Sequence, residues 1–172
     1  REIAASPDGR PYNAEHSIVK IVKPLPILAD SAVATAPFVL PRIPFKVNQY
    51  WTFQSSGALS PPPTFPVVAY QLFNTQAYVD FVRLLEKARP SLTDKLPRSL
   101  DAPMKNKNVG TLMRSIKDIF DQDPELAGQM ISELQRGNFR AADEKAQSRL
   151  VTLVKLYGGS NRRYVNYYGP PH

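Results

Sequence analysis

The sequence contains no cysteine and only two histidines, and these absences exclude several kinds of chemistry. Without thiols the chain forms no disulfide, no thiolate metal site and no cysteine nucleophile. His16 and His172 stand in no metal-ligand spacing and in no Ser/His/Asp arrangement. The sequence therefore offers no catalytic grouping, and we expect a protein that is not an enzyme and binds no cofactor or metal.

The sequence also lacks an apolar run long enough to cross a membrane, which takes about 20 residues. The run from Ala32 to Leu40 is broken by Pro37 and ended by Pro41. We expect no transmembrane segment, while association with a membrane surface stays open. The formal net charge of +7 favours anionic partners, which include nucleic acid, anionic lipid and acidic protein surfaces.

Proline is plentiful and unevenly placed: 11 of the 17 prolines fall between Pro7 and Pro66. Proline removes a backbone donor and fixes φ, so this segment cannot form a continuous helix or a central strand. We expect residues 1–66 to form an extended arm. Short strands are predicted at residues 18–23, which are rich in β-branched side chains, and at residues 45–53, where side chains alternate between two faces.

The strand at residues 45–53 carries the aromatic cluster of the arm, Tyr50, Trp51 and Phe53. Large aromatic side chains dominate the energetics of both cores and interfaces. We predict that these three residues anchor the arm on a partner protein. The alternative, that the single tryptophan Trp51 fills the core of this protein, is equally compatible with the sequence.

The remaining residues are expected to form a mainly α fold, a small bundle of about four helices over residues 67–157. Their apolar positions follow helical spacing, and caps and breakers mark their ends. The four predicted helices run from Asn74 to the residue before Pro90, from Asn108 to about residue 122, from Asp123 to Gly137, and from about Asn138 to the Gly158-Gly159 pair. Residues 91–107 are predicted to be a connecting loop.

An acidic cluster is formed by Asp118, Asp121, Asp123 and Glu125, and its last three members copy the opening of a calcium-binding EF-hand loop. That loop needs glycine at its sixth position and glutamate at its twelfth, where this chain has Leu126 and Ser132. We therefore interpret the cluster as helix capping and not as a metal site.

The C-terminal tail, residues 158–172, is basic and rich in tyrosine. Acidic side chains are absent from residue 145 onward. The candidate partner-binding residues here are Arg162, Arg163, Tyr164, Tyr167 and Tyr168. Arginine pairs with phosphate and tyrosine stacks on bases, which is the RNA-binding interpretation. The same residue types are enriched at protein interfaces, and we favour an acidic protein surface because the basic excess is modest for a phosphate-backbone binder.

The function expected from these features is that of a non-catalytic accessory subunit of a large assembly, whose arm and tail tie neighbouring subunits together. A ribosomal or other RNA-associated protein is the alternative, and a peptide-binding helical domain with a disordered arm is a third reading. The chain opens with Arg1 instead of methionine, which a cleaved organellar presequence or a trimmed chain would explain. A mitochondrial complex is the expected setting.

Overall fold

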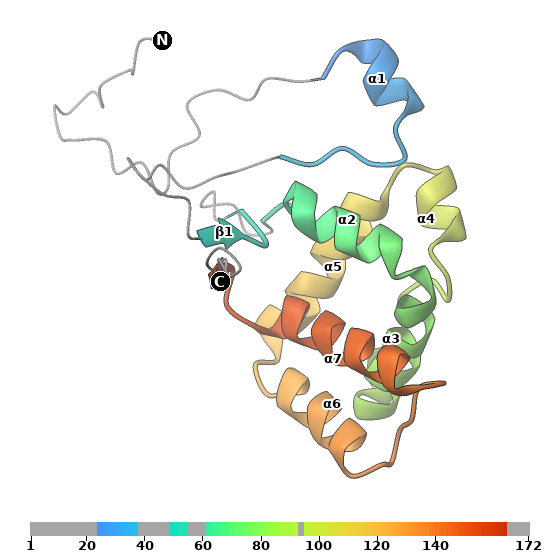
Figure 1. Ribbon diagram of the computed structural model, residues 1–172, viewed down its shortest axis with the longest axis vertical. Coiled ribbons are helices and arrows are strands. Elements are labelled where there is room, and N and C mark those ends of the chain that lie inside the picture. Colours follow the sequence, from blue (N-terminus) through green and yellow to red (C-terminus); the bar gives the residue numbers. More distant parts are fainter. Residues whose placement is uncertain (1–23, 38–48, 55–60, 93–94, 165–172) are drawn as a thin grey trace, which may run out of the picture.

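A computed structural model describes residues 24–37, 49–54, 61–92 and 95–164, and the fold is mainly α (Figure 1). The helices are α1 (Pro26–Ser31), α2 (Phe65–Phe73), α3 (Thr75–Ala88), α4 (Asp101–Lys105), α5 (Val109–Gln122), α6 (Leu126–Gln135) and α7 (Glu144–Gly158). A 3₁₀ turn, η1, spans Pro90–Leu92, and the strands are β1 (Gln49–Trp51) and β2 (Arg162–Tyr164). The predicted strand at residues 18–23 and the first residues of the strand at 45–53 lie outside the described residues.

The four predicted helices correspond to α3, α5, α6 and α7. α3 begins at Thr75 and ends at Ala88, two residues before Pro90. Gly137, which follows α6, has φ of +72°, a conformation that glycine adopts without a steric penalty. The predicted stop of this helix is therefore confirmed, and its physical cause is the left-handed backbone at Gly137.

The start predicted for the last helix was wrong by about six residues. α7 begins at Glu144, because the Asp143 carboxylate accepts a hydrogen bond of 2.7 Å from the Ala146 amide and so caps the helix. Phe139, which helical spacing placed on this helix, precedes it and packs against the core from the connecting segment.

Three helices, α1, α2 and α4, were not predicted, and all lie among prolines; α1 falls within the segment predicted to be an extended arm. α2 begins directly after Thr64 with Pro66 in its first turn, where a missing N–H costs nothing. The predicted loop at residues 91–107 contains part of η1 and all of α4, and it buries Leu96 and Leu100 in the core. The prolines limit the length of helices in these segments but do not prevent short ones.

The core lies where α3, α5 and α6 pack around α7 (Figure 1). Tyr157 of α7 is fully buried, and its ring centroid lies 5.5 Å from that of Phe81, 5.8 Å from that of Phe53 and 6.1 Å from that of Phe120. Three of these four aromatic residues come from predicted helices. The fourth, Phe53, comes from the predicted arm, so this part of the arm is built into the core.

Two buried tyrosines donate hydrogen bonds that join the bundle to its surroundings. The Tyr157 hydroxyl donates to Gln71 Oε1 of α2 over 2.8 Å, and the Tyr78 hydroxyl donates to the Pro97 carbonyl over 2.9 Å. Burial raises the pKa of both phenols well above the ordinary value, since the charged phenolate is disfavoured away from water. Both bonds tie the helices to the proline-rich segments.

Candidate interaction surface

The two segments that the sequence singled out, one in the arm and one in the tail, lie side by side in a single antiparallel ribbon (Figure 1). β1 pairs with β2 so that Tyr50 lies opposite Arg163 and Trp51 lies opposite Arg162. The Thr52 amide continues the pairing with a 2.9 Å hydrogen bond to the Asn161 carbonyl. Residues more than 100 positions apart are thereby brought together at one end of the helical bundle.

A third segment, residues 62–64, lies on the other side of the arm strand. Phe53 forms an antiparallel bridge with Pro63, and the Thr64 amide donates a 2.9 Å hydrogen bond to the Thr52 carbonyl. The Thr64 hydroxyl donates to the Thr52 carbonyl over 3.1 Å. Residues 52–54 therefore lie between two chain segments. This support matters because a short two-stranded ribbon is only marginally stable by itself.

Phe53 is fully buried and serves the core of this protein. Besides Tyr157, its ring faces the ammonium of Lys117, whose Nζ lies 5.9 Å from the ring centroid. Lys117 is itself buried and forms an ion pair with Asp121. Phe53 is therefore not on the surface, and the core role that the sequence left open for Trp51 belongs to Phe53 instead.

Tyr50 and Trp51 are half-buried, so each keeps part of its ring at the surface. Side chains alternate between the two faces of the strand, so Thr52, which is fully buried, lies on the face opposite Trp51. These two aromatic residues remain candidates for partner binding. Their backbone is fixed by β2, which limits the entropy lost when a partner covers them.

Arg163 is committed to α7. Its guanidinium folds back and donates to the Lys155 carbonyl, an orphan acceptor in the last turn of the helix, where a cation is also favoured by the helix dipole. A Cβ at Gly159 would lie 2.3 Å from Arg163 Nη2 and 2.6 Å from the Lys155 oxygen, so only glycine admits this contact. Arg163 has a structural role in addition to the binding role predicted from the sequence.

For Arg162 and Tyr164 the structure describes the strand backbone alone, and Tyr167 and Tyr168 lie outside the described residues. The partner-binding role of these four residues stays a prediction. The exposed basic side chains that the structure describes on α7 are Lys145, Arg149 and Lys155, of which Lys155 lies in the last turn, at the end where the ribbon lies.

Sequence reasoning missed the exposed apolar residues. Among the described residues, the large hydrophobic side chains that stand exposed all lie between positions 25 and 73, on or beside α1 and α2: Leu25, Ile27, Leu28, Val33, Phe65 and Phe73. The described side chains of residues 74–92 and 95–163 add none to this set. The signal was present in the sequence of α2, because its nine residues carry no charge on any side.

α1 lies outside the helical bundle and buries none of its side chains (Figure 1). Leu25, Ile27 and Leu28 are 66%, 73% and 60% exposed. Two hydrogen bonds join α1 and the segment after it to the rest of the fold. The Phe65 amide donates to the Pro37 carbonyl, after α1, over 2.9 Å, and Lys107 Nζ donates to the Asp30 carbonyl within α1. A six-residue helix is too short to be stable in isolation, so α1 depends on such contacts.

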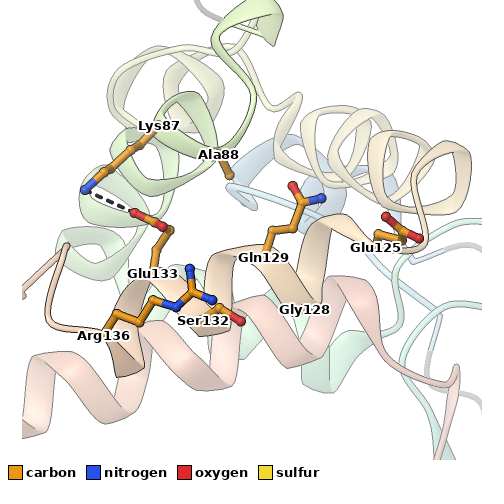
Figure 2. Close-up of a pocket in the computed structure, with 8 residues that line it drawn as sticks. All are labelled: Lys87, Ala88, Glu125, Gly128, Gln129, Ser132, Glu133 and Arg136. Carbon is orange, nitrogen blue, oxygen red and sulfur yellow. Dashed lines mark ion pairs between the residues drawn. The ribbon is translucent and has the colours of Figure 1, made fainter.

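An open groove of about 650 Å³ lies between α3 and α6 and is lined mostly by polar side chains (Figure 2). Lys87 Nζ lies 3.2 Å from a Glu133 carboxylate oxygen across it. Hydrogen bonds from Asn138 and Lys87 lower the pKa of Glu133, so this carboxylate is ionised at neutral pH. The charges of Lys87 and Glu133 form an ion pair that links the two helices, and Ser132 also lines the groove.

Two members of the acidic cluster, Asp121 and Asp123, are used in ion pairs, and no side chain at Glu125 caps α6, so the prediction that the cluster caps a helix was wrong. Asp123 accepts from Arg89 Nε over 2.8 Å, and Asp121 pairs with Lys117. α6 begins at Leu126, without a capping side chain at Glu125. In the described part of the chain, no group of three or more His, Cys, Asp or Glu side chains could hold a metal ion.

Within the described ranges no helix has the length and apolar character needed to cross a bilayer. No family model, curated protein or solved structure matches this chain. The surface described above is therefore the basis for the functional argument.

Proposed function

We propose that this protein is a non-catalytic subunit that binds other proteins through the apolar surface of α1 and α2. The observation that carries the proposal is that, among the described side chains, the large hydrophobic ones that stand exposed all lie within residues 25–73. Burying such side chains contributes about 1.5–3 kcal/mol each, which favours their being covered by a partner. The same chain buries most of the large apolar side chains of α3, α5, α6 and α7, so it does form a well-packed core.

Charge supports a protein as the partner of this surface. The described residues between 24 and 82 contain no lysine or arginine, and their charged side chains are Asp30 and Asp80. Helices that lie on anionic membranes carry basic residues beside their apolar face. α1 and α2 have none, so an apolar protein groove suits them better than a lipid surface.

The ribbon extends the proposed interface. β2 is three residues long and forms one edge of a two-stranded sheet. On its partner strand β1, Tyr50 and Trp51 are only half-buried. Aromatic residues beside a strand edge suit the addition of an extended segment from another chain. Tyr50 and Trp51 therefore remain the partner-binding residues that we favour in the arm.

The test is purification of the tagged full chain from its native source, at low and at high salt, with the co-purifying proteins identified by mass spectrometry. We expect a defined set of proteins that persists at high salt, because apolar contacts are not screened. A double variant, Ile27→Asp with Leu28→Asp, should lose them. Recovery of the chain without protein partners at both salt concentrations would refute the proposal.

Association with RNA is the second candidate, and one observation favours it. Lys145, Arg149 and Lys155 stand exposed along α7, which has its single acidic side chain at Glu144 in the first turn. An RNA role predicts binding whose affinity falls steeply with salt and weakens when Lys145 and Arg149 are replaced by alanine. Arg162→Ala is a cleaner probe of the tail than Arg163→Ala, which would also remove a contact at the end of α7.

A further inference from the structure

The outer face of α2 has a symmetric arrangement of large and small side chains that the proposed subunit role does not require. The inner face buries Val67, Val68 and Gln71. The opposite face carries Phe65 and Phe73, which are 54% and 87% exposed, with the small residue Ala69 midway between them. A helix that is apolar on all sides is normally buried on all sides.

This face is symmetric about Ala69. Because one turn takes about 3.6 residues, positions four before and four after Ala69 lie about 40° to either side of it and about 6 Å above and below it. Those positions are Phe65 and Phe73. Pro66 and Leu72 lie about 60° to either side in the same way. The face therefore presents the same large–small–large order when the helix is read in either direction.

We propose that a second copy of this chain packs against α2, with the two α2 helices antiparallel across a two-fold axis at Ala69. In this arrangement Phe65 of each copy lies beside Phe73 of the other, and the two Ala69 side chains meet at the crossing point. A small residue there lets the helix axes approach to about 8–10 Å. A two-fold interface needs such a self-complementary patch.

Charge also suits a second copy. The chain carries a net charge of +7, so two copies repel each other unless their basic side chains are kept apart. No lysine or arginine occurs from Pro61 to Val82, and the nearest basic residue after α2 in sequence is Arg83. α2 itself therefore contributes no charge to the pairing face, and the basic residues described near it, Lys107 and Arg114, lie beside Pro62 and Pro63, before its first turn.

The exposed area indicates a weak dimer. With about 200 Å² per phenylalanine side chain, the exposed fractions of Phe65 and Phe73 leave about 280 Å² per copy, or about 560 Å² for the pair. Stable interfaces bury about 1,200–2,000 Å². We therefore expect dissociation constants between about 10 µM and about 1 mM, and a dimer that depends on protein concentration.

Disulfide trapping tests the geometry, because the chain has no cysteine of its own and any introduced thiol is unique. Ala69→Cys lies on the axis and should cross-link two copies under mild oxidation. Phe65→Cys should not do so alone, since the two equivalent positions would be about 12 Å apart and a disulfide needs Cα atoms within about 7 Å. A mixture of Phe65→Cys and Phe73→Cys chains should form the mixed dimer.

Ile27→Cys is the matched control, being 73% exposed and on α1. Equal cross-linking rates for Ala69→Cys, Phe65→Cys and Ile27→Cys would mean random collision and would overturn the proposal. At least about tenfold faster cross-linking of Ala69→Cys than of Ile27→Cys is the expected result.

Sedimentation velocity of the full chain gives an independent readout. We expect the mean mass to rise with concentration, Phe73→Asp to abolish the rise, and Ile27→Asp to leave it unchanged, with the same circular dichroism for all three proteins. A chain that stays monomeric up to about 1 mM overturns the dimer, as does an association that Phe73→Asp leaves intact. The dimer assigns Phe65 and Phe73 to a second copy and leaves Leu25, Ile27 and Leu28 at α1 for partner proteins, so its failure would leave the subunit role of α1 untouched.

Discussion

Replacing Phe53 by alanine tests whether the arm strand is a part of the core. Phe53 is fully buried, its ring centroid lies 5.8 Å from that of Tyr157, and Lys117 Nζ faces its ring. Truncating a buried phenylalanine costs about 3–5 kcal/mol, from lost apolar burial and from the cavity that remains. Domains of this kind have unfolding free energies of about 5–15 kcal/mol, so the loss is a large fraction of the whole.

The assay is urea unfolding of the full chain, followed by two signals. Circular dichroism reports the helices, and the fluorescence of Trp51 reports β1, because Trp51 is the only tryptophan. We expect Phe53→Ala to move both transitions to lower urea together. The matched control is Phe73→Ala, the same truncation at an 87% exposed position, which should change the unfolding free energy by less than about 0.5 kcal/mol.

Two results would refute this reasoning. A loss of less than about 1 kcal/mol in the helical transition would mean that Phe53 is not part of the cooperative core. A shift of the Trp51 signal alone, with the helical transition unchanged, would mean that the ribbon unfolds as a separate appendage.

Three further predictions concern the bundle. Gly158→Ala would place a Cβ 2.3 Å from a side-chain carbon of α6 and should lower the unfolding free energy by about 1–3 kcal/mol. Gly128→Ala, whose Cβ would meet nothing within 4 Å, should be neutral or stabilise the fold by up to about 1 kcal/mol. Thermal melts compare the two variants, and equal effects would count against the packing of α7 on α6. Asp143→Ala should remove the cap of α7 at a cost of about 1 kcal/mol, and an unchanged melting temperature would argue against the cap. The raised pKa values of Tyr78 and Tyr157 mean that the folded state holds the two phenol protons more tightly than the unfolded chain does. The stability that these groups contribute is complete below the unfolded pKa of about 10, and above it the unfolding free energy falls by up to about 1.4 kcal/mol per pH unit for each group. Unfolding free energies that stay constant from pH 9 to about pH 11 would contradict this.

Helical spacing was sufficient to predict the bundle. The apolar positions of α3, α5, α6 and α7 repeat at helical intervals and face the core, and glycine or proline follows most of these helices. The boundaries were harder because several short polar side chains compete as caps. Asp143 caps α7, whereas the Asn74 side chain donates to the Tyr70 carbonyl at the end of α2 instead of capping α3.

The proline-rich segments were predicted less well, since proline density obscured short helices. Pro66 is a favourable first-turn residue in α2, yet together with Pro61, Pro62 and Pro63 it indicated an extended arm. Tertiary contacts decided the outcome: the Gln71 side chain accepts from Tyr157, and Val67 and Val68 are buried.

The sequence predicted a part of the candidate interaction surface. The sequence directed attention to both strands of the ribbon, but no local pattern could show that residues 49–51 pair with residues 162–164, because strand pairing over such a separation is set by the fold. It also could not show that Phe53 turns inward while the apolar side chains of α1 remain exposed. Exposure follows from packing, which periodicity does not determine for segments this short.

Hydrogen exchange of the free chain and of the complex recovered from the native source tests the central claim most directly. If α1 and α2 form the surface that partner proteins cover, amides of residues 25–33 should exchange fast in the free chain and at least about tenfold more slowly in the complex. The amides of α7 should be protected in both. Equal exchange of residues 25–33 in the two samples, with protection gained only along the basic face of α7, would contradict the account.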